Sequence, residues 1–82
     1  MILVDIYIPS VDKTYDFSLD ETVEIQTIIE EIVEMVGQKE HTTITGDMAA
    51  LWLCDSLTKR KLPRTALLED CGIHNGSSLL LV

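Results

Sequence analysis

The sequence predicts an α+β fold with one helix and four to five strands. Three observations support this: apolar and polar residues alternate near the N-terminus, apolar residues recur every three or four positions over 25–36, and alternation returns at the C-terminus. Of the 82 residues, 46% are apolar and only two are proline, a composition typical of a folded chain. Because a chain of this length has room for one core, we expect a single domain over residues 1–82.

The N-terminal segment predicts a β-hairpin. In MILVDIYIPS one parity is entirely aliphatic, so a strand here buries Ile2, Val4, Ile6 and Ile8. Pro9 ends this strand, and a turn around 11–13 leads into TYDFSL, a second strand that places Tyr15, Phe17 and Leu19 on one side.

The period then changes to that of a helix beginning after Thr22, which is a plausible N-cap, and stopped by Gly37 in a left-handed conformation. Its buried face is expected to hold Ile25, Ile28, Ile29, Ile32, Met35 and Val36. The opposite face carries Glu24, Glu30, Glu31 and Glu34. A solvated surface is the simpler interpretation of these carboxylates, and an acidic docking face is the alternative.

The second half is expected to complete the sheet. After the polar stretch 38–47, MAALWLCD (48–55) predicts a third strand with Leu51 and Leu53 inward and Trp52 outward. LTKRKLPR (57–64) predicts a short edge strand and loop, because charge and proline both suit an edge. A compact loop over 65–76 then leads to SSLLLV, a final strand with Leu79 and Leu81 on one face.

The charge excludes several classes of partner. Fourteen acidic against six basic side chains give a net charge of −8, which repels nucleic-acid phosphates and anionic lipid. No apolar run approaches the roughly 20 residues of a membrane span, and the first apolar stretch alternates like a strand and not like a signal peptide. We therefore expect a cytoplasmic protein with no nucleic-acid partner and no membrane insertion. In that reducing compartment Cys54 and Cys71 are expected to be unpaired thiols.

No catalytic or metal-binding pattern is present. His41 and His74 both fall in polar segments, and no local motif connects them to Cys54 or Cys71. The GIHNG turn (72–76) lacks the lysine of a phosphate-binding loop and precedes a strand, so Asn75 and Gly76 are expected to form a turn. We expect a protein that is not an enzyme and that holds no cofactor or metal.

The C-terminal residues carry a family resemblance. The signature L-x-D-x-x-I-x-x-x-S/T-x-L-x-L-V, which resembles ubiquitin, stands here as Leu68, Asp70, Ile73, Ser78, Leu79, Leu81 and Val82. Together with the order hairpin, helix, strand, it implies the β-grasp (ubiquitin-like) fold, in which a mixed sheet of four to five strands packs on one helix. Asp70 is expected to act only as a turn or capping residue.

Among β-grasp proteins the sequence most resembles the YukD/EsaB family, on the start MILVDIYIPS and the closing DCGIHNGSSLLLV. The resemblance implies a cytoplasmic accessory protein of type VII secretion, which supports export of WXG-type substrates through a membrane-bound ATPase. Conjugating relatives end in Gly-Gly and this sequence stops at Val82, so we expect a non-conjugated protein. Two alternatives stay open: a modifier or sulfur carrier whose Gly-Gly tail is missing here, and a ubiquitin-like domain cut from a larger secretion membrane protein.

Binding is expected on the sheet face that the helix leaves uncovered. Strand parity assigns to it Leu3, Tyr7, Trp52, Leu80 and Val82. In a ubiquitin-like arrangement Trp52, Leu80 and Val82 form one patch, for which the secretion ATPase, membrane components or a second copy are candidate partners. Ordinary exposed apolar surface, or a Trp52 ring folded over the sheet edge, is the simpler alternative. Lys59, Arg60, Lys61 and Arg64 either contact an acidic partner or guard an edge.

Overall fold

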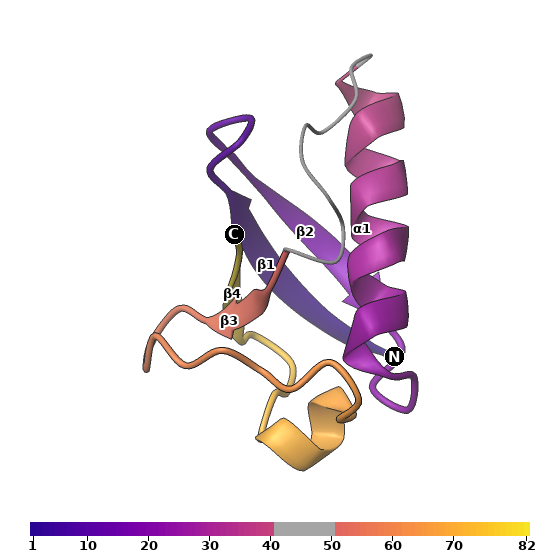
Figure 1. Ribbon diagram of the computed structural model, residues 1–82, viewed down its shortest axis with the longest axis vertical. Coiled ribbons are helices and arrows are strands. Elements are labelled where there is room, and N and C mark those ends of the chain that lie inside the picture. Colours follow the sequence, from indigo (N-terminus) through magenta and orange to yellow (C-terminus); the bar gives the residue numbers. More distant parts are fainter. Residues whose placement is uncertain (41–50) are drawn as a thin grey trace.

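The computed structural model describes residues 1–40 and 51–82 and shows one helix lying across one face of a four-stranded sheet (Figure 1). His41, considered above as a candidate reactive residue, and residues 48–50 of the predicted third strand lie outside the described residues. In chain order the regular segments are β1 (Ile2–Ile8), β2 (Lys13–Leu19), α1 (Ile25–Lys39), β3 (Leu53–Asp55), a short 3-10 helix (Leu68–Cys71) and β4 (Ser78–Leu81).

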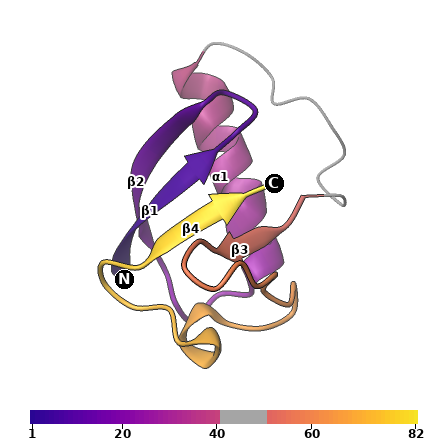
Figure 2. The same cartoon turned by 90° about the vertical axis from the view of Figure 1, so that its left-hand side faces the viewer.

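The sheet has the strand order β2-β1-β4-β3. β1 and β2 form the predicted antiparallel hairpin, with Ile2 opposite Leu19 and Ile8 opposite Lys13. β4 runs parallel to β1 in the centre, and β3 pairs antiparallel with β4. Figure 2 looks onto the sheet with α1 behind it and shows that the first strand, β1, and the last strand, β4, are neighbours. The predicted α+β, β-grasp arrangement is therefore confirmed, with four strands.

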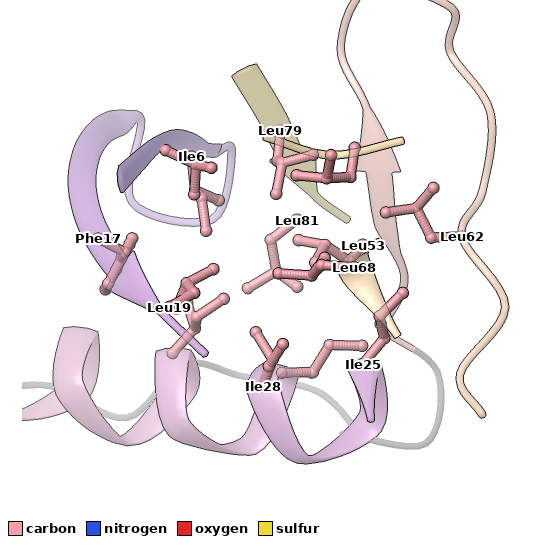
Figure 3. Close-up of a cluster of buried hydrophobic side chains, with 14 of the residues drawn as sticks. Ile6, Phe17, Leu19, Ile25, Ile28, Leu53, Leu62, Leu68, Leu79 and Leu81 are labelled. Atoms are coloured by element: carbon pink, nitrogen blue, oxygen red, sulfur yellow. The ribbon is translucent and has the colours of Figure 1, made fainter. Parts of the chain in front are cut away.

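The core lies between the sheet and α1, where side chains of one parity from each strand meet the apolar face of the helix (Figure 3). Ile6, Ile25, Ile32, Leu53 and Leu68 are completely buried. No polar or charged side chain is buried among the described residues, so this core is held by apolar contacts alone. Within residues 1–40 and 51–82, no helix combines the length and apolar character needed to cross a membrane.

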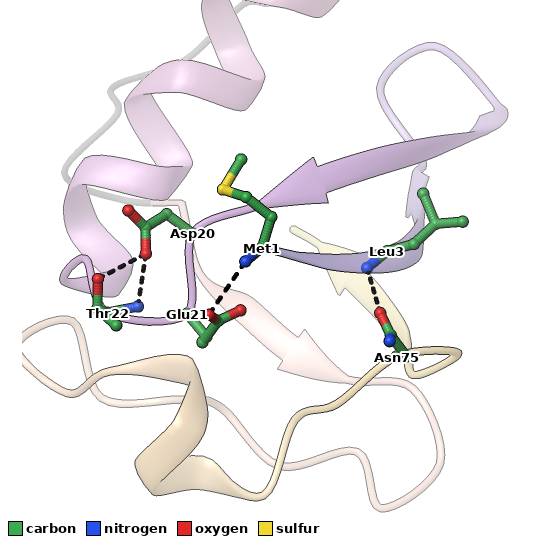
Figure 4. A network of polar contacts seen from close by, with 6 residues as sticks. All are labelled: Met1, Leu3, Asp20, Glu21, Thr22 and Asn75. Atoms are coloured by element: carbon green, nitrogen blue, oxygen red, sulfur yellow. Dashed lines mark hydrogen bonds and ion pairs between the residues drawn. The ribbon is translucent and has the colours of Figure 1, made fainter.

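Both predicted ends of the helix were wrong. The N-cap is Glu24, and Thr22 instead donates its hydroxyl and its backbone N–H to one Asp20 carboxylate oxygen, at 2.6 and 2.9 Å (Figure 4). Gly37 lies inside α1, which continues to Lys39. Met35, predicted on the buried face, is 45% exposed. Packing of Ile32 and Val36 against the sheet offsets the weak helix propensity of Gly37.

The second half has less strand than predicted. β3 covers only Leu53–Asp55, and Leu51 is half-buried against the core. The predicted edge strand over 57–64 reduces to a single bridge between Cys54 and Lys61. The predicted loop over 65–76 contains the 3-10 helix, whose C-cap Gly72 adopts a left-handed φ of 76°.

The turn before β4 is tied directly to β1. Gly76, at φ 87°, donates its N–H to the Leu3 carbonyl at 2.8 Å. The Asn75 side-chain oxygen accepts the Leu3 N–H at 2.8 Å (Figure 4). Of the two predicted turn residues, only Gly76 has a positive φ. Asn75 therefore acts through its side chain, by fixing the turn to the neighbouring strand.

Candidate protein-binding face

The sheet face opposite α1, here called the outer face, carries a row of side chains that crosses all four strands. Tyr7 in β1 lies opposite Thr14 in β2 and beside Leu80 in β4, which in turn pairs with Cys54 in β3. Paired residues on one face of a sheet lie close enough for their side chains to touch. Tyr7 is 37% exposed and Leu80 is half-buried, so the centre of this row is an apolar surface that solvent can reach.

The row continues one pair further along the outer strands. Trp52 and Val82 exchange backbone hydrogen bonds in both directions, at 2.6 and 3.0 Å, and so extend the β3–β4 ladder past Leu53 and Leu81. Because Leu53 and Leu81 face the core, strand alternation sends Trp52 and Val82 to the outer face. We call Tyr7, Leu80, Val82 and Trp52 the outer-face cluster.

Trp52 is half-buried within this cluster. The Lys61 ammonium and the Arg64 guanidinium each lie 5.0 Å from the centre of its ring, a cation–π geometry. Arg64 also donates a hydrogen bond to the carbonyl of Leu51. The ring is on the predicted side of the sheet, but it packs against the segment that borders β3 and presents only part of its surface.

Leu3 is not brought together with the other four predicted residues. It is 56% exposed on the outer face, but four positions from Tyr7, or about 13 Å along an extended strand. Between them the Ser78 hydroxyl donates to the Asp5 carboxylate at 2.7 Å. This polar pair separates Leu3 from the outer-face cluster.

The phenol of Tyr7 has a polar anchor. Its hydroxyl donates to the Asp12 carboxylate at 2.8 Å. This hydrogen bond, with smaller contributions from desolvation and from the Asp12 charge, raises the pKa of Tyr7 above its ordinary value of 10.0. Asp12 itself has a left-handed φ of 52° in the β1–β2 turn. The hydrogen bond orients the ring, which limits the entropy that binding would cost.

Among the described residues, Cys54, Cys71 and His74 do not assemble into a reactive site. Cys54 is buried, and desolvation, followed by the charge of Asp70, raises the pKa of the half-buried Cys71 thiol. A thiol with a raised pKa is a poor nucleophile at neutral pH. The His74 ring lies against the Asn75 carbonyl, 2.9 Å away. Among residues 1–40 and 51–82 no three His, Cys, Asp or Glu side chains are placed to hold a metal ion.

The sequence reasoning missed two residues, Cys54 on the outer face and Leu57 in the loop beside it in the chain. Cys54 belongs to the outer-face row, and the alternation that sends Trp52 outward also assigns Cys54 to the same face. Leu57, 90% exposed, stands in the loop after β3. No periodicity marks Leu57, because it belongs to a turn in which Asp55 accepts its backbone N–H at 2.9 Å. Asp70, expected to act as a turn or capping residue, is exposed within the 3-10 helix, where its N–H donates to the Leu67 carbonyl at 3.1 Å and no side-chain cap is formed.

The sequence also matches a family directly. The family model described as "WXG100 protein secretion system (Wss), protein YukD" matches residues 3–81. The chain belongs to the YukD family. It is thus a ubiquitin-like protein of type VII (WXG100) secretion, as the sequence resemblance indicated.

Solved structures confirm the fold of this YukD family member. It is similar to the EccD5 ubiquitin-like domain from Mycobacterium xenopi, with 18% identity, a TM-score of 0.77, and coverage of 99% of this chain and 91% of that one. The Caldiarchaeum subterraneum ubiquitin has 15% identity and a TM-score of 0.72, with 98% and 89% covered. The chain also matches ATBAG1, solved in complex with HSP70, at 13% identity and a TM-score of 0.74, covering 100% of this chain but 40% of that one. No functionally curated protein matches the sequence.

The ubiquitin-like signature now has a structural explanation for this YukD family member. Leu68, Ile73, Leu79 and Leu81 are all buried, and the Ile73 N–H donates to the Leu68 carbonyl at 3.1 Å. The buried members of the signature therefore form the part of the core that joins the 3-10 helix to β4. These buried members account for the shared fold, whereas Val82, the last residue of the signature, belongs to the outer-face cluster on the other side of the sheet.

Proposed function

We propose that this YukD family member is a non-conjugated accessory protein that acts in the cytoplasm by binding another protein through the outer-face cluster. The proposal treats residues 1–82 as one ubiquitin-like domain with no catalytic activity. The family match supports the link to secretion. The candidate partners are the secretion ATPase and the membrane components around it, and a homodimer is the remaining alternative.

One observation carries the binding proposal. α1 covers the inner face of the sheet. On the outer face Tyr7 is 37% exposed and Val82 is 45% exposed, on adjoining strands. They lie next to the half-buried Leu80 and Trp52. Tyrosine and tryptophan contribute more binding energy at interfaces than most residue types. An apolar surface held on rigid strands is preorganised, so little ordering is needed when a partner docks.

Position-specific photocrosslinking in native cells tests the proposal. A photoreactive residue is placed at Tyr7 or Val82, and the control is placed at Met35, which is 45% exposed on α1. We expect a component of the secretion machinery to crosslink from the outer face and not from Met35. Equal crosslinking from all three positions, or none from the outer face, would overturn the proposal.

The intact mass of the recovered protein, measured before crosslinking, tests whether the protein is covalently attached to other proteins. A mass that corresponds to the chain alone supports a docking protein. Covalent attachment to other proteins would instead support a modifier with a Gly-Gly tail.

A second candidate function is a ubiquitin-like domain of a larger secretion protein. It is favoured by the similarity to the EccD5 ubiquitin-like domain, of which this chain covers 91%. The 3′ end of the gene separates the two. A stop codon after Val82 supports the separate accessory protein, and an open reading frame that continues into further domains supports the second candidate.

A further inference from the structure

The basic side chains of this acidic protein are concentrated beside the outer-face cluster. Four of the six lysines and arginines fall within residues 59–64, although the net charge is −8. The other two are engaged elsewhere: Lys13 pairs with Glu40 at 2.9 Å, and the Lys39 ammonium lies 5.2 Å from the centre of the Tyr15 ring. Segment 59–64 is therefore the main positive surface of the described chain.

Edge protection does not account for these charges. The backbone of this segment already covers β3: Asp55 donates its N–H to the Arg60 carbonyl at 2.9 Å, and Leu62 donates to the Leu53 carbonyl at 2.9 Å. Figure 2 shows the chain turning back along β3 in this region. An edge closed by backbone hydrogen bonds needs no charged side chain to repel other strands. The side chains of 59–61 are consequently available for another role.

Three of these cations face solvent without a carboxylate partner in the described structure. Lys59, Arg60 and Lys61 are all exposed, and none forms an ion pair with a described acidic residue. Lys61 is the link to the apolar surface, because it pairs with Cys54 in the outer-face row and its ammonium lies over the Trp52 ring. The positive segment therefore meets the apolar surface at Lys61.

We propose that the partner segment docked on the outer-face cluster is acidic, with carboxylates that pair with Lys59, Arg60 and Lys61 while its apolar residues contact Tyr7 and Val82. The argument is charge complementarity: Lys59, Arg60 and Lys61, which form no ion pair with a described carboxylate, attract an acidic segment and repel a basic one. This inference rests on the proposed function, since it assigns the chemistry of the partner at the same face.

The test uses defined probes and nuclear magnetic resonance. The isotopically labelled full chain is titrated with the cytoplasmic domains of the proteins encoded in the same secretion locus, and with overlapping peptides of about 20 residues, the size of one side of a standard interface. We expect the probes that shift the Tyr7, Leu80 and Val82 amide signals to have acidic runs next to apolar residues. For these probes the triple variant Lys59→Gln, Arg60→Gln, Lys61→Gln should bind about tenfold more weakly, the combined effect of three exposed ion pairs.

A matched control separates local charge from net charge. The variant Ser10→Glu, Thr27→Glu, Gln38→Glu makes the same change, from −8 to −11, at exposed positions outside segment 59–64. It should retain most of the affinity. Tyr7→Ser, in contrast, should weaken binding of every outer-face probe, whatever its charge.

The outcomes distinguish this inference from the proposed function. If Tyr7→Ser abolishes binding but the triple Gln variant binds normally, the outer face is the docking site and the acidic partner is wrong. If no probe shifts the outer-face signals, both proposals fail. Binding to vesicles of phosphatidylcholine with phosphatidylglycerol, or concentration-dependent self-association, that is lost in the triple Gln variant would assign the basic segment to lipid or to a second copy and would overturn the inference.

Discussion

At the residue scale, Leu57 and Leu68 show that position, not residue type, decides what a side chain contributes. Leu68 is completely buried where the 3-10 helix meets the core, while Leu57 is 90% exposed in the loop after β3. Both are leucines in segments without clear periodicity. Only the tertiary contacts separate a stabilising residue from one that is available for binding.

Truncation of these two leucines should therefore have very different effects. Leu68→Ala is expected to lower the free energy of unfolding by about 2–5 kcal/mol, because it removes buried contacts and leaves a cavity. Leu57→Ala should change it by less than about 0.5 kcal/mol. Urea unfolding of both variants checks this, and similar losses in the two would mean that Leu57 is covered in solution.

Asp20 predicts a specific pH dependence. Hydrogen bonds from the Thr22 hydroxyl, and then from the Thr22 backbone N–H, hold the pKa of Asp20 below its ordinary value of 3.8. A carboxyl whose pKa is depressed by folding stabilises the fold above its unfolded pKa and loses that contribution as the pH falls through the folded pKa. Stability should accordingly decline below about pH 4.

Denaturant unfolding between neutral and acidic pH tests this contribution. Asp20→Asn should reduce the loss of stability at acidic pH. Thr22→Val should reduce it only in part, because this change removes the hydroxyl donor but keeps the backbone donor. If both variants follow the same pH profile as the parent, the Asp20–Thr22 hydrogen bonds do not contribute to folding.

At the element scale, Gly37 and Gly72 have opposite roles. Gly37 lies within α1, where glycine is less favourable than alanine, while Gly72 ends the 3-10 helix at a φ of 76°, which L-residues disfavour. Gly37→Ala should stabilise the protein by about 0.5–1 kcal/mol, and Gly72→Ala should destabilise it by about 1 kcal/mol. Thermal unfolding of the pair gives the signs. A destabilised Gly37→Ala would mean that the helix ends at Gly37.

Periodicity predicted the segments that pack continuously and failed where packing is interrupted. β1, β2, β4 and the buried face of α1 follow their patterns because one face of each contacts the core along its whole length. β3 is shorter than expected because it pairs with β4 only over Leu53–Asp55, with the Trp52–Val82 hydrogen bonds as the last rung, and on its other edge Lys61 contributes a single bridge. Strand propensity does not reveal where a neighbouring strand stops.

The candidate site shows the same limit. Alternation assigned all five predicted residues to the outer face, but it gives no distance along a strand. Leu3 is separated from the outer-face cluster by the Asp5–Ser78 hydrogen bond. The cover of Lys61 and Arg64 over Trp52 depends on how residues 59–64 fold back, which the sequence pattern does not specify.

At the scale of the whole molecule, charge works against compactness. With a net charge of −8 on 82 residues, the carboxylates repel one another. Among the described groups two ion pairs offset this repulsion, one between Lys13 and Glu40 and one between the Met1 amino group and Glu21. Such repulsion destabilises the folded state and is screened by salt. The positive segment 59–64 partly balances it.

Salt should therefore stabilise this protein, and more strongly when segment 59–64 is neutralised. Raising sodium chloride from about 20 mM to about 500 mM shortens the screening length from about 20 Å to below about 5 Å, so repulsion between distant carboxylates is removed. We expect the urea midpoint to rise with salt in the parent, and to rise further in the triple Gln variant, whose net charge is −11. Repeating the series with sucrose, which favours compact states without screening charge, should raise the two midpoints equally. If the urea midpoint of the parent does not change with salt, its carboxylates are too widely spaced for their repulsion to affect stability. In that case the binding measurements on the charge variants need no correction for partial unfolding.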